Sequence, residues 1–316
     1  MESKTDLDAM GTDAVRVMPL GKECLAMTGS DRSRFLNGVV TANVASVPVG
    51  GGTQALLLTA KAHIVAEMRV FVRPEQLTLL VEAGQGEATA AALARYAVMD
   101  DVTIAPVPDF ALLALLGPRA AERLAAAGVD LSALEGKPVW SHADGKVWWV
   151  ARVEQFGSEG FWIGGPSAEV HALDATLGAA GVPRLTSEAQ ESARVRALEP
   201  AWGHEITDEF FPMEIGLGDA IDYRKGCFLG QEPIVRIRDR GHLNWRLARL
   251  ELDEGTAAAP GDRLETDAKP KAGKLTSVAR GDDGRAAALA VVHVSVSPGT
   301  SVRVVTASGV VQAIVR

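Results

Sequence analysis

At 316 residues, the chain is long enough for two or three compact units, each with its own buried core. Hydrophobic residues make up 47% of the sequence and charged residues 23%, which is typical of a globular protein and excludes a disordered or fibrous one. The net charge of -8 argues against a general nucleic-acid coat, because that class of protein needs a basic surface.

Residues 1–20 carry acidic side chains where a secretory signal would carry a basic leader. No segment reaches the roughly 18 consecutive apolar residues of a membrane span. We therefore expect a cytoplasmic protein without membrane contact, with a flexible tail over residues 1–15. Cys24 and Cys227 are too far apart in sequence for a CxxC motif, so we expect free thiols and no metal site.

The first half of the chain alternates between helical and strand patterns without a repeat. The first expected helix starts at Ser30 or Asp31 and carries Phe35, Leu36, Val39 and Val40 on one side. Two strands are expected within 54–72, followed by a helix over 86–99 and a strand over 111–117. The next helix is expected over 118–127, and Gly128 ends it.

Residues 136–165 contain six aromatic side chains on short strand patterns separated by DGK and GSEG turns. We interpret most of these rings as core or cross-strand packing. Two further helices are expected, one that begins at Ser167 and one over 187–199 with a capping box of Ser187 and Gln190. From residue 243 onward, short alternating runs between Gly, Pro and Asp turns predict a six-stranded barrel or sandwich.

The segment KGCFLGQE, residues 225–232, joins the mixed region to this β unit, in a connection of the kind that often carries function. Gly226 and Gly230 allow backbone conformations that are closed to other residues, so the chain can turn tightly or approach a ligand. Lys225 and Arg224 beside Cys227 would favour the thiolate and raise its reactivity. The residues alone leave two interpretations open, a poised thiol or a small buried hydrophobic side chain.

KGCFLGQE also resembles the K-G-C-[FY]-x-G-Q-E signature of the YgfZ-like tetrahydrofolate-binding proteins, relatives of the glycine-cleavage T-protein, an aminomethyltransferase. Three more segments resemble elements of the same family: GSDRSRFLNGVVTANV, FPMEIGLGDAI and GKLTSVAR. The resemblance covers about residues 20–316.

The resemblance implies an α+β fold in which two interleaved α+β units form a ring around a folate-sized cavity, followed by a small C-terminal β-barrel. The domains expected are the tail at 1–15, a folate-binding α+β region at 16–242 and the barrel at 243–316. Tetrahydrofolate or a derivative is the implied cofactor. The implied role is to support the synthesis or repair of iron-sulfur enzymes, including those that thiolate tRNA, so iron-sulfur client or assembly proteins are the expected partners.

The sequence also departs from the T-protein. Where that enzyme has an acidic pair after its first hairpin, this chain has Ala66 and Glu67. In the run that resembles L-R-x-E-x-G, the arginine falls at Arg194, but Arg196 stands in place of the glutamate that grips the pterin and Leu198 in place of the glycine. The signature cysteine is absent from the T-protein's own version of the motif. These departures argue against aminomethyl transfer.

Residues 224–249 hold seven basic side chains against two acidic ones, a net charge of +5. In PIVRIRDR, the alternation of Arg236, Arg238 and Arg240 predicts that they project from one face of a strand. That face could bind the glutamate tail of a folate, another anion or tRNA. It could equally be a solvated strand face whose arginines protect an edge.

We expect Cys227 to be the catalytic residue and the folate to lie near it. The residues expected to bind the cofactor are Glu67, Arg194, Lys225, Gly226, Gly230, Gln231, Glu232 and Arg236. Three functions remain open: a folate-binding accessory factor for iron-sulfur proteins, a folate-dependent one-carbon transferase, and a ligand-free scaffold. Whether the chain is an enzyme stays open. Nothing in the sequence requires more than a monomer.

Overall fold

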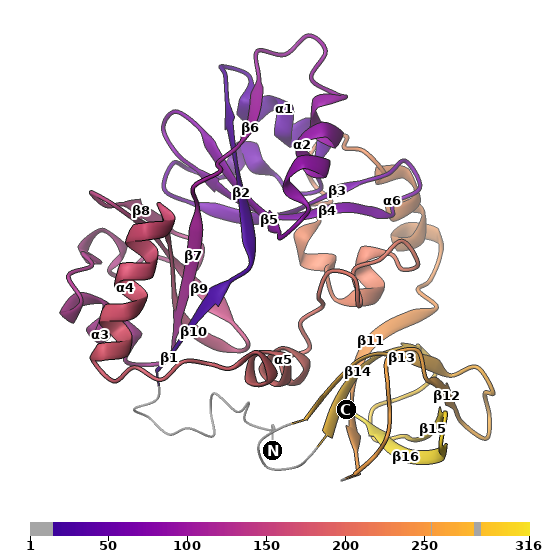
Figure 1. The fold of residues 1–316 in the computed structure, drawn as a ribbon. Helices are drawn as coiled ribbons and strands as arrows, with labels where there is room; N and C mark the ends of the chain where they lie inside the picture. The colour runs from indigo at the N-terminus through magenta and orange to yellow at the C-terminus, as the bar shows by residue number, and fades with distance from the viewer. Residues whose placement is uncertain (1–14, 254, 281–285) are drawn as a thin grey trace. The chain divides into compact units, whose positions relative to one another are not determined.

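The computed structural model describes residues 15–253, 255–280 and 286–316 (Figure 1). Apart from Val15, the predicted tail over residues 1–15 lies outside these ranges. No helix within the described ranges is long and apolar enough to cross a membrane.

Tertiary contacts divide the chain into two compact units. The sheet unit consists of residues 15–185 and 220–231. The barrel unit consists of the described residues of 186–219 and 232–316.

The sheet unit contains two antiparallel five-stranded sheets. The first has the order β3-β4-β5-β2-β6, with bounds β2 (Lys22–Thr28), β3 (Gly52–Leu58), β4 (Ile64–Val72), β5 (Leu77–Glu82) and β6 (Thr103–Pro106). The second has the order β1-β7-β10-β9-β8, with bounds β1 (Arg16–Leu20), β7 (Ala111–Leu116), β8 (His142–Asp144), β9 (Trp149–Gln155) and β10 (Ser158–Gly165). In sequence, β1 of the second sheet precedes all strands of the first sheet, and the other strands of the second sheet follow them. The two sheets are therefore interleaved along the chain, as predicted.

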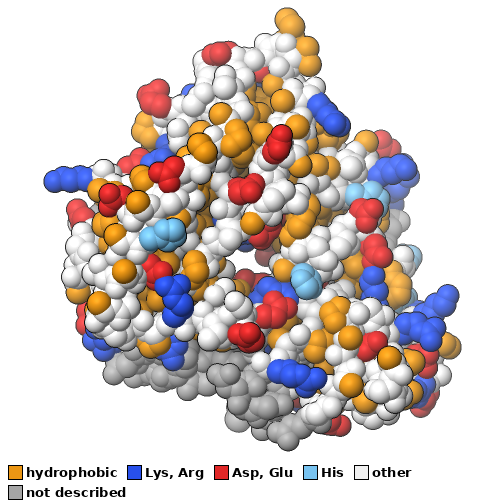
Figure 2. Space-filling view, in the orientation of Figure 1, with side chains coloured by type: hydrophobic (Ala, Val, Ile, Leu, Met, Phe, Trp, Pro, Cys, Tyr) orange, Lys and Arg blue, Asp and Glu red, His pale blue; other side chains and the backbone are white. Residues whose placement is uncertain are grey.

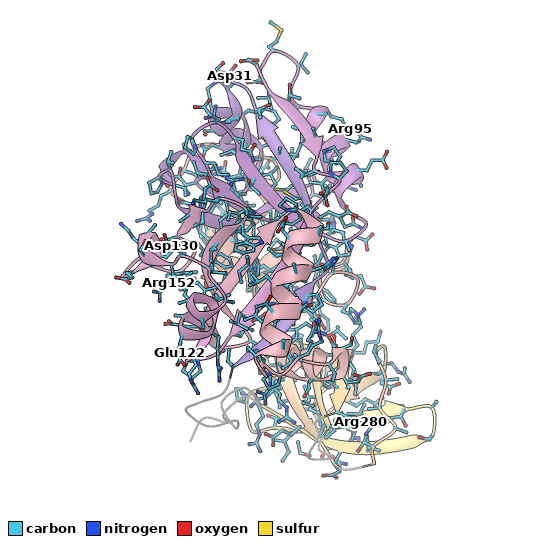
Figure 3. The ribbon with its side chains drawn as sticks, turned by 60° about the vertical axis from the view of Figure 1, so that its left-hand side comes forward. Asp31, Arg95, Glu122, Asp130, Arg152 and Arg280 are labelled. Atoms are coloured by element: carbon cyan, nitrogen blue, oxygen red, sulfur yellow. The ribbon has the colours of Figure 1, made fainter. Side chains whose placement is uncertain are left out.

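Helices cover one face of each sheet (Figures 1 and 3). The first sheet packs its apolar side chains against α1 (Arg32–Val39) and α2 (Gly86–Ala94). The second packs against α3 (Ala120–Ala126) and α4 (Ser167–Ala179). The expected helix over 86–99 is therefore real but ends at Ala94. Gly128, with φ at +86°, ends the turn after α3 in the left-handed conformation that the sequence predicts.

Aromatic rings pack between the other faces of the two sheets. Phe71 of β4 contacts Trp149 of β9 at a centroid distance of 5.0 Å and His142 of β8 at 5.4 Å. Four of the six aromatic side chains of 136–165 are buried, which confirms their interpretation as packing; these are Trp149, Phe156, Phe161 and Trp162.

The barrel unit contains a closed six-stranded barrel with the order β11-β14-β13-β12-β15-β16. This confirms a barrel and excludes the alternative of a sandwich. Small residues such as Ala288 and Ala290 fill its interior beside Leu and Val, as a narrow barrel requires. The strands are β11 (Trp245–Leu252), β12 (Arg263–Glu265), β13 (Gly273–Arg280), β14 (Ala286–His293), β15 (Ser301–Thr306) and β16 (Gly309–Val315).

Two helices, α5 and α6, follow α4 and precede the barrel in the chain. The first is α5 (Ser187–Arg196), whose N-cap is Thr186, with its hydroxyl accepting from Ala189 N–H, and not the predicted Ser187. Short 3₁₀ turns complete the fold: η2 (Val44–Ser46), η3 (Ser132–Leu134), η4 (Pro212–Ile215) and η5 (Gly218–Ala220).

The predicted strand over PIVRIRDR is wrong, because Gln231–Arg240 forms helix α6. Pro233 stands in the first turn, where its missing N–H is tolerated, whereas proline is excluded from a central strand. With 3.6 residues per turn, Arg236 and Arg240 share one side of this helix and Arg238 lies on the opposite side. The three arginines therefore do not form the single face that a strand would give.

Candidate functional site

The loop that carries the KGCFLGQE signature, within residues 220–231, is fastened to the sheet unit through Thr41. The Thr41 hydroxyl donates to the Ala220 carbonyl at 2.6 Å, and the Asp222 N–H donates to the Thr41 carbonyl at 3.0 Å. The same hydroxyl accepts from Leu56 N–H of β3 at 2.9 Å. The beginning of the loop is thereby fixed against the first sheet.

Lys225 anchors the loop to the end of α1. Its ammonium donates to the main-chain carbonyls of Asn37, Val40 at 2.7 Å and Ala42 at 2.8 Å. Burial lowers the pKa of Lys225 to about 8. Because all three N–H donors bond to these carbonyls, the side chain has a structural task, and the thiolate-activating role that its sequence position suggests has no support in this geometry.

Two further residues of the signature dock the loop. Gly230 has φ at +79°, and a Cβ at this position would lie 2.5 Å from the carbonyl oxygen of Thr59. Only glycine fits there, because both the backbone conformation and the close approach exclude a side chain. Phe228 is buried and lies under the Lys225 ammonium at 5.5 Å. Gly226, by contrast, has no neighbour within 4 Å of its hypothetical Cβ.

The two cysteines have opposite environments. Cys227 is exposed on the docked loop, whereas Cys24 is buried in β2. Burial raises the pKa of the Cys24 thiol to about 12. Cys24 is therefore inert, and Cys227 is the thiol that a partner or reagent can reach.

The last predicted residues of the loop lie at the start of α6. Gln231 is the first residue of the helix and its N–H bonds to the Phe228 carbonyl at 3.3 Å. Glu232 is exposed and pairs with Arg236 at 2.9 Å. Arg238 pairs with Asp239 on the same helix. Two of the seven basic side chains of residues 224–249 are thus paired within the helix.

A buried carboxylate lies on β4, on the face opposite α1 and α2. Glu67 is 6% exposed, and its Oε1 accepts from Gln54 Nε2 at 3.0 Å and from Arg69. The Arg69 guanidinium lies over the Trp140 ring at 5.0 Å. Ala66 points the other way, into the apolar core, so position 67 alone of the expected acidic pair can face a ligand.

The Glu67 cluster, formed by Gln54, Glu67, Arg69 and Trp140, has unused hydrogen-bonding capacity. Both hydrogen bonds to the Glu67 carboxylate end on Oε1. Among the described residues, no donor bonds to Oε2, which can therefore still accept a hydrogen bond. The Arg69 Nε–H is buried and has no acceptor among the described residues. A buried donor without an acceptor is costly unless a ligand or water pairs with it.

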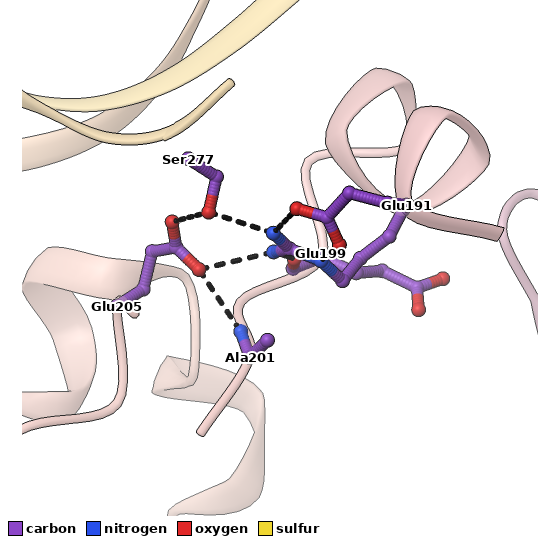
Figure 4. A network of polar contacts seen from close by, with 6 residues as sticks. Glu191, Glu199, Ala201, Glu205 and Ser277 are labelled. Atoms are coloured by element: carbon purple, nitrogen blue, oxygen red, sulfur yellow. Dashed lines mark hydrogen bonds and ion pairs between the residues drawn. The ribbon is translucent and has the colours of Figure 1, made fainter. Parts of the chain in front are cut away.

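Arg194, the other residue expected near the folate, belongs to the barrel unit and is surrounded by acceptors (Figure 4). Its guanidinium bonds to both oxygens of Glu191, at 2.8 and 2.5 Å, and to the fully buried Glu205 at 3.0 Å. It also bonds to the Ser277 hydroxyl at 2.6 Å and the Glu199 carbonyl at 2.7 Å.

These five contacts occupy all five N–H donors of the Arg194 guanidinium. Glu205 is satisfied too, since it also accepts from the Ser277 hydroxyl at 2.7 Å and Ala201 N–H at 3.0 Å. Burial opposes ionisation of Glu191, but the hydrogen bonds from Arg194 hold its pKa below the usual value. The network fastens α5 to β13, and Arg194 has no donor left for a ligand.

The sheet unit contains both the signature loop and Glu67, and it brings Glu67 together with Gln54, Arg69 and Trp140, which the sequence did not predict. The contacts that hold the loop, to Thr41, Thr59 and the end of α1, are separate from this cluster. Residues two apart on a strand share a face, so the spacing of Glu67 and Arg69 could have indicated their pairing. Gln54 stands opposite Arg69 on the neighbouring strand, a register that the sequence does not fix. Arg194, Glu232 and Arg236 belong to the barrel unit.

The sequence and the fold both resemble those of known proteins. Residues 19–225 match the family model of the GCVT N-terminal domain. The tRNA-modifying protein YgfZ of Cronobacter sakazakii is 27% identical over 298 residues, which span 90% of this chain and 86% of that protein. A chloroplastic protein of Arabidopsis thaliana that carries a transferase name is 29% identical over 82% of this chain. This chain spans 60% of the length of that plant relative.

The fold has a solved counterpart. The glycine cleavage system aminomethyltransferase T from Bartonella henselae superposes with a TM-score of 0.86 and 22% identity. The superposition covers 96% of this chain and 86% of that structure. At this identity, the likeness shows the fold.

Proposed function

Because this chain belongs to the family of the GCVT N-terminal domain, as a YgfZ-like, GcvT-related protein, we propose that it binds a reduced folate. In this proposal it is an accessory protein that supports the synthesis or repair of iron-sulfur enzymes, including enzymes that modify tRNA. The signature loop presents Cys227 for that work.

One observation carries the folate part of the proposal, the unused capacity of the Glu67 cluster. A pterin ring presents N–H donors and a carbonyl acceptor on one edge. Oε2 of Glu67 can accept from such an N–H, and the buried Nε–H of Arg69 can donate to such a carbonyl. A bound reduced folate supplies one-carbon chemistry, and the residues of the cluster hold and orient the ring.

Calorimetry with 5-formyltetrahydrofolate tests this part. We expect binding in the micromolar range, about -8 kcal/mol. No heat of binding up to millimolar folate would contradict the folate assignment and favour a ligand-free scaffold.

The role of Cys227 rests on how the signature loop is held. Lys225, Phe228 and Gly230 fasten the loop to the sheet unit, while Cys227 is exposed. A loop fixed in this way presents its thiol in one position, which favours recognition by an iron-sulfur client over packing.

The cysteine is tested by Cys227→Ser. We expect a thermal midpoint near that of the wild type and lower activity of tRNA-modifying iron-sulfur enzymes in cells. Cys24→Ser is the matched control, because a hydroxyl in the buried site of Cys24 costs about 1 to 3 kcal/mol without touching the loop. Full client activity in Cys227→Ser would remove the thiol from the function.

Folate-dependent one-carbon transfer is the second candidate, favoured by the fold shared with aminomethyltransferase T. Against it, Ala66 points into the apolar core, and Arg196 stands where a pterin-binding glutamate is expected. We expect no methylene transfer above background from 5,10-methylenetetrahydrofolate. Turnover by the purified wild type would establish this candidate instead.

A further inference from the structure

The barrel unit contains a pocket of about 310 Å³ that the proposed folate function does not use. Its walls come from the loop before η4 and from strands β11 to β14. Its volume lies at the lower end of the range for binding pockets, enough for one large side chain. Its lining includes the apolar side chains of Phe210 and Trp245 and the charged side chains of Glu209, Arg263, Lys271 and Lys274.

The apolar part of the pocket is aromatic. Phe210 is held in place by the Lys274 ammonium, which lies 5.1 Å from its ring centroid. Trp245 is only partly buried and meets the edge of His293 at 5.6 Å. A group that enters the pocket would therefore contact two fixed rings, and pairs of aromatic rings add about 0.5 to 1.5 kcal/mol beyond the area they bury.

The rim of the pocket is basic. Arg263 and Lys274 are direct partners on β12 and β13, and like charges that face each other across strands are destabilising. Glu209 pairs with Lys274. Among the described residues, no carboxylate pairs with Arg263 or Lys271, although the chain as a whole has a net charge of -8. Figure 2 shows basic, acidic and apolar side chains interspersed over the barrel.

We propose that this pocket docks an acidic segment of a partner protein that inserts one aromatic side chain. An aromatic anchor in a pocket, surrounded by a charged rim, is the arrangement that concentrates binding energy in protein interfaces. The uncompensated charge of Arg263 and Lys271 selects carboxylates beside the anchor and speeds encounter with them.

Selection from a phage library of random 12-residue peptides on the full chain tests the proposal. Enriched peptides should combine an aromatic residue with neighbouring Asp or Glu. Replacing that aromatic residue by Ala in a synthetic peptide should weaken binding at least tenfold, and binding should weaken as salt rises.

Charge reversal locates the site. Arg263→Glu with Lys271→Glu should weaken the selected peptide at least tenfold. Both positions are exposed, so the thermal midpoint should stay within a few degrees of the wild type. Arg95→Glu with Lys146→Glu is the matched control. It changes the net charge by the same amount as the first double variant, but at exposed positions of the sheet unit. Arg95 lies directly after α2 (Figure 3). The control should change binding by less than about twofold.

Three results would overturn the proposal: enrichment of peptides without acidic residues, no enrichment over bare support, or equal losses in the two double variants. Indole-3-acetate provides a further arm. If it displaces the peptide at micromolar concentration, the pocket is a small-molecule site and the docking assignment is wrong.

Discussion

Two buried glutamates, each paired with an arginine, occupy different units of this protein. In the barrel unit, every donor of Arg194 meets a protein acceptor, and Glu205 accepts three hydrogen bonds. In the sheet unit, both bonds to Glu67 end on Oε1, and the Arg69 Nε–H has no acceptor in the described chain. Burial and charge alone therefore do not identify a binding site, because a completed network such as that of Arg194 holds the fold together.

The largest expected effect comes from breaking the complete network. Arg194→Ala leaves Glu205 buried without its cation, so we expect the free energy of unfolding to fall by about 3 to 5 kcal/mol. Urea titration measures it. Arg236→Ala removes an exposed pair with Glu232 and should cost at most about 1 kcal/mol. Similar losses in the two variants would contradict the structural role of Arg194.

The next effect concerns the glycines of the signature loop. Gly230→Ala forces a Cβ against the Thr59 carbonyl in a left-handed conformation, so it should lower the free energy of unfolding by about 2 to 3 kcal/mol. Gly226→Ala is the matched control, because its Cβ would meet nothing within 4 Å. Equal thermal midpoints for the two variants would show that the loop is not docked as described.

The sequence could predict the parts of the fold that periodicity fixes. The alternating runs after residue 243 indicated the barrel, and the runs around the Ala-Lys-Ala-His turn indicated β3 and β4. The same alternation misleads in PIVRIRDR, because Pro233 and the helical spacing of Ile234 and Ile237 favour a helix although the charges alternate with period two.

The candidate site was predicted only in part, because its partners are set by tertiary contacts. Lys225 is adjacent to Cys227 in sequence, yet its ammonium bonds to carbonyls at the end of α1. Arg194 was expected to bind a ligand, but Glu205 and Ser277, distant in sequence, occupy its donors. Spacing along the chain cannot report contacts of this kind.

His142 shows that a buried polar atom without a partner does not by itself mark a ligand-binding site. Its Nδ1 is buried and has no partner in the described chain, and burial lowers its pKa to about 4 from an ordinary value of 6.5. Between those two pH values the unfolded chain binds the proton and the folded protein does not, so acidification over this range should remove about 3 kcal/mol of stability.

The His142→Gln variant checks this pH dependence. It should flatten the fall in unfolding free energy between pH 6.5 and pH 4, and it should leave folate affinity unchanged. His171→Gln, on the exposed side of α4, is the control and should keep the wild-type slope. A wild-type slope in His142→Gln would place the acid sensitivity elsewhere.

The affinity of Glu67→Gln for 5-formyltetrahydrofolate tests the central claim most directly. The substitution keeps the shape of the side chain but turns a carboxylate oxygen into an N–H donor, so calorimetry should show binding weakened about tenfold, or about 1.4 kcal/mol. The urea midpoint should change far less than in Arg194→Ala, and Glu159→Gln, at an exposed ion pair, should bind as the wild type does. Unchanged affinity in Glu67→Gln would contradict the assignment of the folate to the Glu67 cluster.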